Sequence, residues 1–233
     1  MADWVWIQWQ WEDWEGTKEC KLACVLKQDG DKLSEVGLLS TWDRITWFRK
    51  MLEWLMLWIV WAALPMVIIS DWAKWIKNLR TKISCLRKAE WILDWFHLKE
   101  KIMNTLRILD IEEESKNAKN IISFLWIWES EIAIKLLNEL SLSDEKEKKE
   151  QQEASLKNAI RYLSNQKEWI INYQAYQMKW YIVWSGYIEK KNDLLIKDRM
   201  VRQKRMRWWR WWGEAMIQLL TAQMNGRLSE LYA

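Results

Sequence analysis

The chain has 233 residues, enough to bury the core of a medium-sized domain, and its 36 Lys and Arg against 32 Asp and Glu leave a net charge of +4. Total charge therefore indicates no class of partner, and three cysteines without a C-x-x-C pair support neither a disulfide framework nor a zinc finger. The abnormal figure is 23 Trp against 6 Gly and 1 Pro, because turns and helix ends normally use glycine to reach positive φ.

The first hundred residues alternate strand-like and helix-like patterns. Helical spacing of apolar residues predicts helices at about 42–63 and 73–84. The word DWFH at 94–97 is expected to end the last strand of this part. Alternating or short apolar runs predict the strands themselves at residues 5–8, 19–26, 37–41, 66–70 and 89–93.

Residues 98 to about 180 contain no Gly or Pro and read as helix after helix. The charge run at 144–153 is typical of a solvated helix or linker. A final helix is expected at 213–228. The order of elements predicts an α/β fold interrupted by an all-helical insertion, with a first core part at 1–97, the insertion at 98–180 and a second core part at 181–233.

A membrane-spanning segment is one reading of residues 51–70. Glu53 is their only charge, and the apolar stretch that follows is close to the lower limit of the roughly 17–25 residues that a spanning helix needs. Pro65 splits the stretch and disfavours a helix at the residue before it. We therefore prefer a helix followed by a short buried strand, with no membrane contact, and keep the span as the minor alternative.

Acidic residues at strand ends are candidates for chemistry, because sites in open α/β sheets form at the carboxyl ends of strands. Asp71 follows VIIS, Asp94 follows AEWIL, and Asp3 precedes the first strand-like segment. Glu189 stands in SGYIEKKND, after the helical stretch. Taken singly, each of these residues has an equally simple reading as a helix N-cap or a surface charge.

Four longer sequence motifs make this set of candidate acidic residues more specific: ISDWAKWIKN, ILDWFHLKEKI, WSGYIEKKNDLLIKDRM and GEAMIQLLTAQMNGRL. In this order they resemble the catalytic part of bacterial insertion-sequence transposases of the DDE type, in the group related to Mutator-like elements. The resemblance runs from Asp3 to Arg227. It implies a ribonuclease H-like core, a mixed sheet with flanking helices, interrupted by the helical insertion.

Tryptophan repeatedly stands where that family has glycine. Trp95 and Trp208, in contrast, match tryptophans of the family. We hypothesise that the gene uses UGA as a glycine codon and was translated with UGA read as Trp, which would explain both the excess of Trp and the deficit of Gly. UGG codons at positions 4, 72 and 184 would contradict this hypothesis. The clearest such positions are Trp4, Trp72 and Trp184, with Trp91, Trp126 and Trp180 as further candidates.

The resemblance implies that Asp3, Asp71 and Glu189 hold two divalent ions, Mg²⁺ or Mn²⁺. Carboxylate oxygens suit such cations. Two ions of this kind promote in-line displacement at phosphorus, which would cut DNA at the ends of the element and join those ends to target DNA. His97 matches an Asp-x-x-His pair of related transposases and is expected to position DNA or a metal-bound water, or else to be a structural hydrogen-bonding residue.

The segment KDRMVRQKRMRWWR after Glu189 predicts a basic helix that contacts DNA phosphates, although an ordinary exposed cationic helix has the same charge pattern. The residues expected to bind DNA are Arg199, Arg202, Lys204, Arg205, Arg207 and Arg210.

The N-terminus lacks the pattern of a signal peptide, and we expect a cytoplasmic, nucleoid-associated protein that acts as a homo-oligomer on DNA. The resemblance also implies a DNA-recognition region before Asp3 that is missing here. Two other functions remain open: a repurposed transposase remnant that binds DNA without cutting it, and a Trp-rich membrane protein.

Overall fold

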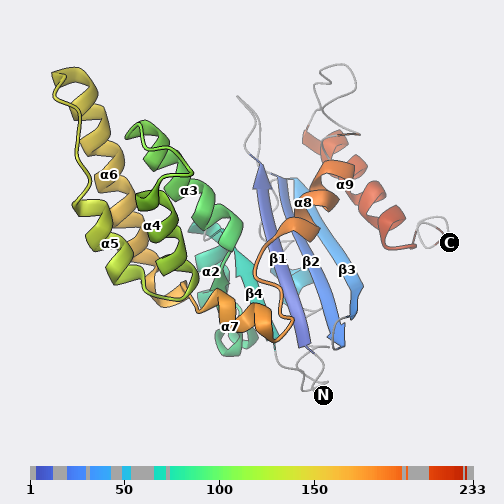
Figure 1. Cartoon of the computed structure of the whole chain (residues 1–233). Helices are drawn as coiled ribbons and strands as arrows, with labels where there is room; N and C mark the ends of the chain where they lie inside the picture. Colours follow the sequence, from blue (N-terminus) through green and yellow to red (C-terminus); the bar gives the residue numbers. More distant parts are fainter. Residues whose placement is uncertain are drawn as a thin grey trace. The chain divides into compact units, whose positions relative to one another are not determined.

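The computed structural model describes residues 4–12, 20–29, 32–42, 49–53, 66–71, 74–195, 198, 210–227 and 229. These residues form two compact units (Figure 1). The first unit contains residues 1–91 and 185–233, and the second contains residues 92–184. The fold is mixed α/β, as the sequence predicts.

A mixed five-stranded sheet is the centre of the first unit, with strand order β3-β2-β1-β4-β5. Strand β1 pairs antiparallel with β2, β2 pairs antiparallel with β3, and β1 pairs parallel with β4. The boundary between the two units falls within the last strand, β5: its first two residues belong to the first unit and its last two to the second. The bounds are β1 Trp4–Glu12, β2 Cys20–Asp29, β3 Lys32–Trp42, β4 Met66–Ser70 and β5 Glu90–Leu93.

The five predicted strands are confirmed, but the first three are longer than their patterns indicate. Antiparallel pairing carries β1 to Glu12 and starts β3 at Lys32, because backbone hydrogen bonds continue past the apolar stretch of each strand. Strand β4 is buried along its whole length, which explains its unbroken apolar run MVIIS.

Helices of the first unit pack on this sheet. Helix α8 (Gly186–Asn192) contacts β1 and β2, and α9 (Arg210–Met224) contacts β3. Helix α2 (Lys74–Lys82) and the short helix η1 (Ser84–Lys88) connect β4 to β5. The helix predicted at 73–84 is thus confirmed as α2. Of the helix predicted at 42–63, residues 49–53 are helical, whereas Trp42 belongs to strand β3.

A polar stripe on α9 covers strand β3, which is an edge strand of the sheet. The stripe is spaced for one face of a helix. Asn225, the last residue of the stripe, lies just beyond the end of α9. Its side-chain amide bonds to β3 as a neighbouring strand would: Oδ1 accepts the Leu38 N–H at 2.9 Å, and Nδ2 donates to the Leu38 carbonyl at 2.9 Å. The contact thereby occupies backbone groups that could pair with another chain. The stripe consists of Glu214, Gln218, Thr221 and Asn225, which bond to Leu38, Ser40 and Thr41.

We expect Asn225→Ala to lower the free energy of unfolding by about 1–3 kcal/mol, because it leaves the N–H and C=O of Leu38 without these partners. Urea denaturation measures the change. Asn138→Ala is the matched control: this exposed amide donates only to Ile134 O within its own helix, and its loss should cost under about 0.5 kcal/mol. Equal losses in the two variants would contradict a role for Asn225 in covering the strand.

The second unit is helical, and apolar residues at helical spacing form its core. Its helices are α3 Trp95–Ile108, α4 Lys116–Trp126, α5 Ser130–Asn138, α6 Lys146–Gln166, η2 Lys167–Trp169 and α7 Tyr173–Met178. Helix α3 begins at Trp95, three residues before the helical stretch that the sequence predicts, because the side chain of Asp94 caps it.

Among the described residues, no helix is both long and apolar enough to cross a membrane. Of the segment 51–70, the described residues are 51–53, which are helical, and strand β4. The basic segment at 197–210 lies almost wholly outside the described residues; Arg210 is the first residue of α9, and its side chain is not described.

Candidate metal centre

Asp94 lies at the carboxyl end of β5, directly before helix α3. Hydrogen bonds fix the backbone on both sides of it. The buried Tyr173 hydroxyl donates to the Leu93 carbonyl at 2.9 Å, and the Trp95 N–H donates to the Val183 carbonyl at 3.1 Å. Burial, together with the nearby Asp94 charge, raises the pKa of Tyr173, so its hydroxyl remains a donor.

An aromatic cluster supports this backbone. Trp95 packs against Trp126 with ring centroids 4.6 Å apart and against Tyr173 at 5.0 Å. Trp126 also stacks on Tyr173 at 5.7 Å, with an interplanar angle of 18°. Three large rings from α3, α4 and α7 therefore hold the start of α3 in place.

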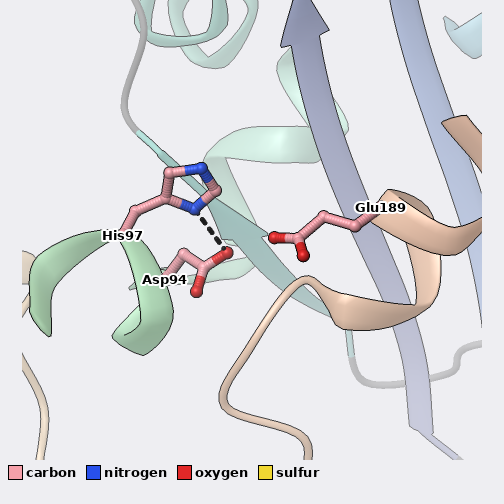
Figure 2. A group of neighbouring side chains, drawn as sticks. All are labelled: Asp94, His97 and Glu189. Carbon is pink, nitrogen blue, oxygen red and sulfur yellow. Dashed lines mark hydrogen bonds and ion pairs between the residues drawn. The ribbon is translucent and has the colours of Figure 1, made fainter. Parts of the chain in front are cut away.

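The Asp94 carboxylate is buried, and each of its oxygens has a directed contact. Oδ1 accepts the Phe96 N–H at 2.8 Å, and Oδ2 lies 3.0 Å from Nδ1 of the half-exposed His97 (Figure 2). A carboxylate only accepts hydrogen bonds, so His97 directs its Nδ1 proton to Asp94, and in the neutral imidazole the lone pair is then on Nε2. Metal-binding histidines commonly have this arrangement, with a carboxylate fixing one ring nitrogen.

Glu189 belongs to helix α8 of the first unit. Ser185, the residue before the helix, donates its hydroxyl proton to Glu189 Oε1 at 2.8 Å. The bond restricts the carboxylate to the first turn of the helix. The helix itself is held by its buried residues Ile188 and Asn192.

Asp94, His97 and Glu189, drawn together in Figure 2, are a set of side chains in the described part of the chain whose donors could hold a metal ion. Two carboxylates and an imidazole are ligands that Mn²⁺ and Zn²⁺ accept, and the carboxylates also suit Mg²⁺. The sequence predicts Glu189 and His97 as site residues, whereas Asp94 stands out in it only as a strand-end carboxylate. The Asp-x-x-His spacing was the signal for Asp94.

Asp71 follows the last residue of β4 and is partly exposed. It is not a member of that three-residue set. Asp3 lies outside the described residues. The parallel register puts Val5 opposite Met66 and Gln8 opposite Ile69. The end of β4 next to Asp71 is therefore level with the middle of β1, several residues after Trp4.

The structure distinguishes two groups among the tryptophans. Trp180 has a φ of 64° and Trp128 a φ of 77°, in the left-handed region that favours glycine, and their side chains are 75% and 63% exposed. Trp91, in contrast, is buried and donates its Nε1 proton to Leu86 O at 2.8 Å, and Trp126 is a member of the aromatic cluster. Trp184 is 44% exposed, and Trp72 lies outside the described residues.

No protein-family model, curated protein or solved structure matches this chain.

Proposed function

We propose that this chain is the catalytic part of a DDE-type transposase that cuts and joins DNA at phosphodiester bonds with the help of divalent ions. The observation that carries the proposal is the buried Asp94 carboxylate, bonded to His97 at the carboxyl end of β5. A second strand-end carboxylate, Asp71, follows β4. Carboxylates at the ends of neighbouring strands are a common basis of sites in α/β sheets.

The sheet order supports a ribonuclease H-like core for this function. Three antiparallel strands, β1 to β3, are followed by β4, which returns parallel to β1, and by β5 beyond it. Glu189 then follows on a helix that packs on β1 and β2. The resemblance to DDE transposases implies such a mixed sheet with flanking helices, interrupted by a helical insertion before Glu189.

Few residues separate Val183 from Glu189 along the chain. The hydrogen bond from Trp95 fixes Val183 beside the start of α3, and Glu189 is only six residues further along the chain. Three extended residues and three helical ones span at most about 16 Å between Cα atoms. We propose that Glu189 completes the metal site with Asp94 and His97.

Divalent ions bound here would polarise the scissile phosphate and promote attack by water or a DNA 3′-hydroxyl. Asp94 and Glu189 would bind an ion through carboxylate oxygens, and His97 would contribute Nε2 as a ligand or as a proton acceptor at the attacking oxygen. Asp71 would hold a second ion at the end of β4. Asp94 also fixes the His97 ring, because it accepts the Nδ1 proton.

The proposal is tested with supercoiled plasmid DNA incubated with the purified chain. We expect nicking or joining with Mn²⁺ or Mg²⁺ and none with EDTA, because the carboxylates cannot promote the reaction alone. Asp71→Ala and Glu189→Ala should abolish the activity. Salt-sensitive DNA binding without cleavage in any metal would instead identify a DNA-binding protein that lacks catalytic activity.

A further inference from the structure

Helix α8 has only seven residues, Gly186–Asn192, too few to be stable without tertiary contacts. Its orientation therefore depends on what its side chains bind. The buried Ile188 and Asn192 anchor one side of the helix. A second set of contacts joins it to Glu35 on strand β3, in the same unit.

The Glu35 carboxylate bonds to two residues of α8 that are one helical turn apart. Oε2 accepts the Tyr187 hydroxyl proton at 2.7 Å and lies 2.5 Å from Lys191 Nζ. Both charged side chains are largely buried, with 18% of Lys191 and 19% of Glu35 exposed. The Lys191 ammonium also lies 5.4 Å from the centroid of the Tyr187 ring. We call Glu35, Tyr187 and Lys191 the Glu35 cluster; each of the three residues contacts the other two.

The surroundings favour these contacts. Burial and the hydrogen bond to Glu35 raise the pKa of Tyr187, which keeps its hydroxyl protonated as a donor. Burial raises the pKa of the neighbouring Cys24 thiol to about 12, and the Glu35 charge adds to the rise, so Cys24 stays neutral. Lys191 therefore has Glu35 as its anionic partner in this cluster. A partly buried ion pair of this kind is costly to break from one side.

Helix geometry connects this cluster to Glu189. Successive residues are rotated by about 100°, so Tyr187 and Lys191 lie within about 40° of each other around the helix. Glu189 is about 200° from Tyr187, on the opposite side. Fixing Tyr187 and Lys191 against β3 therefore fixes the direction in which the Glu189 carboxylate leaves the helix.

We propose that Glu35 is a positioning residue for the metal site: through Tyr187 and Lys191 it sets the rotation of α8 and so directs Glu189 to the ion. This inference rests on the proposed function, because it requires Glu189 to be a metal ligand. Residues that only orient a ligand typically change metal affinity by about 10–100-fold when they are replaced.

The experiment is a double-mutant cycle with Mn²⁺ affinity, measured by isothermal titration calorimetry, as its readout. Glu35→Gln should weaken Mn²⁺ binding about 10–100-fold, and Glu189→Gln should weaken it at least as much. In the double variant, Glu35→Gln should add no further loss, because its effect passes through Glu189. Circular dichroism verifies that each variant is folded.

Two further variants keep the test decisive if Glu35→Gln unfolds the chain. Tyr187→Phe removes one hydroxyl and should weaken binding several-fold, whereas Lys191→Arg keeps the ion pair and should bind nearly as the unmodified chain does. Glu131→Gln is the matched control. It breaks the exposed Lys167–Glu131 pair of the second unit and should leave Mn²⁺ affinity unchanged.

The outcomes separate the two proposals. If Glu189→Gln binds Mn²⁺ as tightly as the unmodified chain, the role of Glu189 in the proposed function is wrong. If Glu189→Gln weakens binding while Glu35→Gln and Tyr187→Phe do not, only the positioning role is wrong. Losses that add in the double variant would also overturn it, since Glu35 would then act independently of Glu189.

Discussion

Replacing Trp126 by glycine is expected to lower the free energy of unfolding by about 3 kcal/mol, near the lower end of the range for deleting a large aromatic side chain, because the ring is only partly buried. The indole packs against Trp95 at 4.6 Å and stacks on Tyr173 at 5.7 Å. With glycine at this position, the rings of Trp95 and Tyr173 lose their contacts with the indole. Urea denaturation followed by fluorescence of the remaining tryptophans measures the change.

Trp180→Gly is the matched comparison, with the opposite expected sign. Trp180 is 75% exposed and has a φ of 64°, so glycine relieves backbone strain while little packing is lost. We expect a gain of about 1 kcal/mol, and Trp128→Gly at a φ of 77° should behave likewise. If Trp180→Gly were as destabilising as Trp126→Gly, the conformation at Trp180 would not be one that favours glycine.

These signs bear on the hypothesis that some tryptophans are misread glycine codons. A glycine at position 180 suits the positive φ of the backbone there, whereas a glycine at position 91 or 126 would remove a buried or stacked ring. The nucleotide sequence gives an independent test: UGA at 180 and UGG at 95 would support the hypothesis. UGG at 4, 72, 180 and 184 would contradict it.

Asp94→Ala is expected to weaken Mn²⁺ binding by more than the roughly 10–100-fold typical of residues that only orient a ligand. It should also lower the free energy of unfolding by about 1–2 kcal/mol, because Asp94 caps α3 through the Phe96 N–H. Asp94→Asn separates these effects. Asparagine is an equally good cap, so this variant should keep stability within about 0.5 kcal/mol and still lose most of the metal affinity.

Ser115→Ala is the control for the capping effect. Ser115 caps α4 by accepting the Ala118 N–H at 3.2 Å, and its loss should cost about 1 kcal/mol without changing Mn²⁺ binding. Calorimetric titration measures the affinities and urea denaturation the stabilities. Tight Mn²⁺ binding by a folded Asp94→Asn chain would mean that Asp94 acts only as a helix cap.

The sequence predicts the elements well where a local pattern decides them. The buried run MVIIS is strand β4, and CKLACVL of the alternating run lies in β2, because apolar periodicity directly reflects burial. The sequence is less informative about where strands and helices begin and end. Strand β3 begins at Lys32 and helix α3 at Trp95, since pairing with β2 and capping by Asp94 set those limits.

The candidate site was only partly accessible from the sequence. Glu189 and His97 follow from short words of a transposase-like pattern, and Asp94 differs from any other strand-end carboxylate only by its spacing to His97. Nothing in the local sequence indicates that the Tyr173 hydroxyl binds Leu93 O, 80 residues away, or that Glu35 bonds to Tyr187, 152 residues away. Such contacts depend on how elements that are distant in the chain pack.

The sequence by itself therefore determined the strands, the helical stretch and the carboxylates available for chemistry, because periodicity and residue type are local properties. The tertiary structure decided which carboxylate is buried against a histidine, which residues hold α8, and which tryptophans have a backbone suited to glycine. Those properties arise from burial, hydrogen-bond direction and φ, which a chain acquires only when its separate segments are packed together.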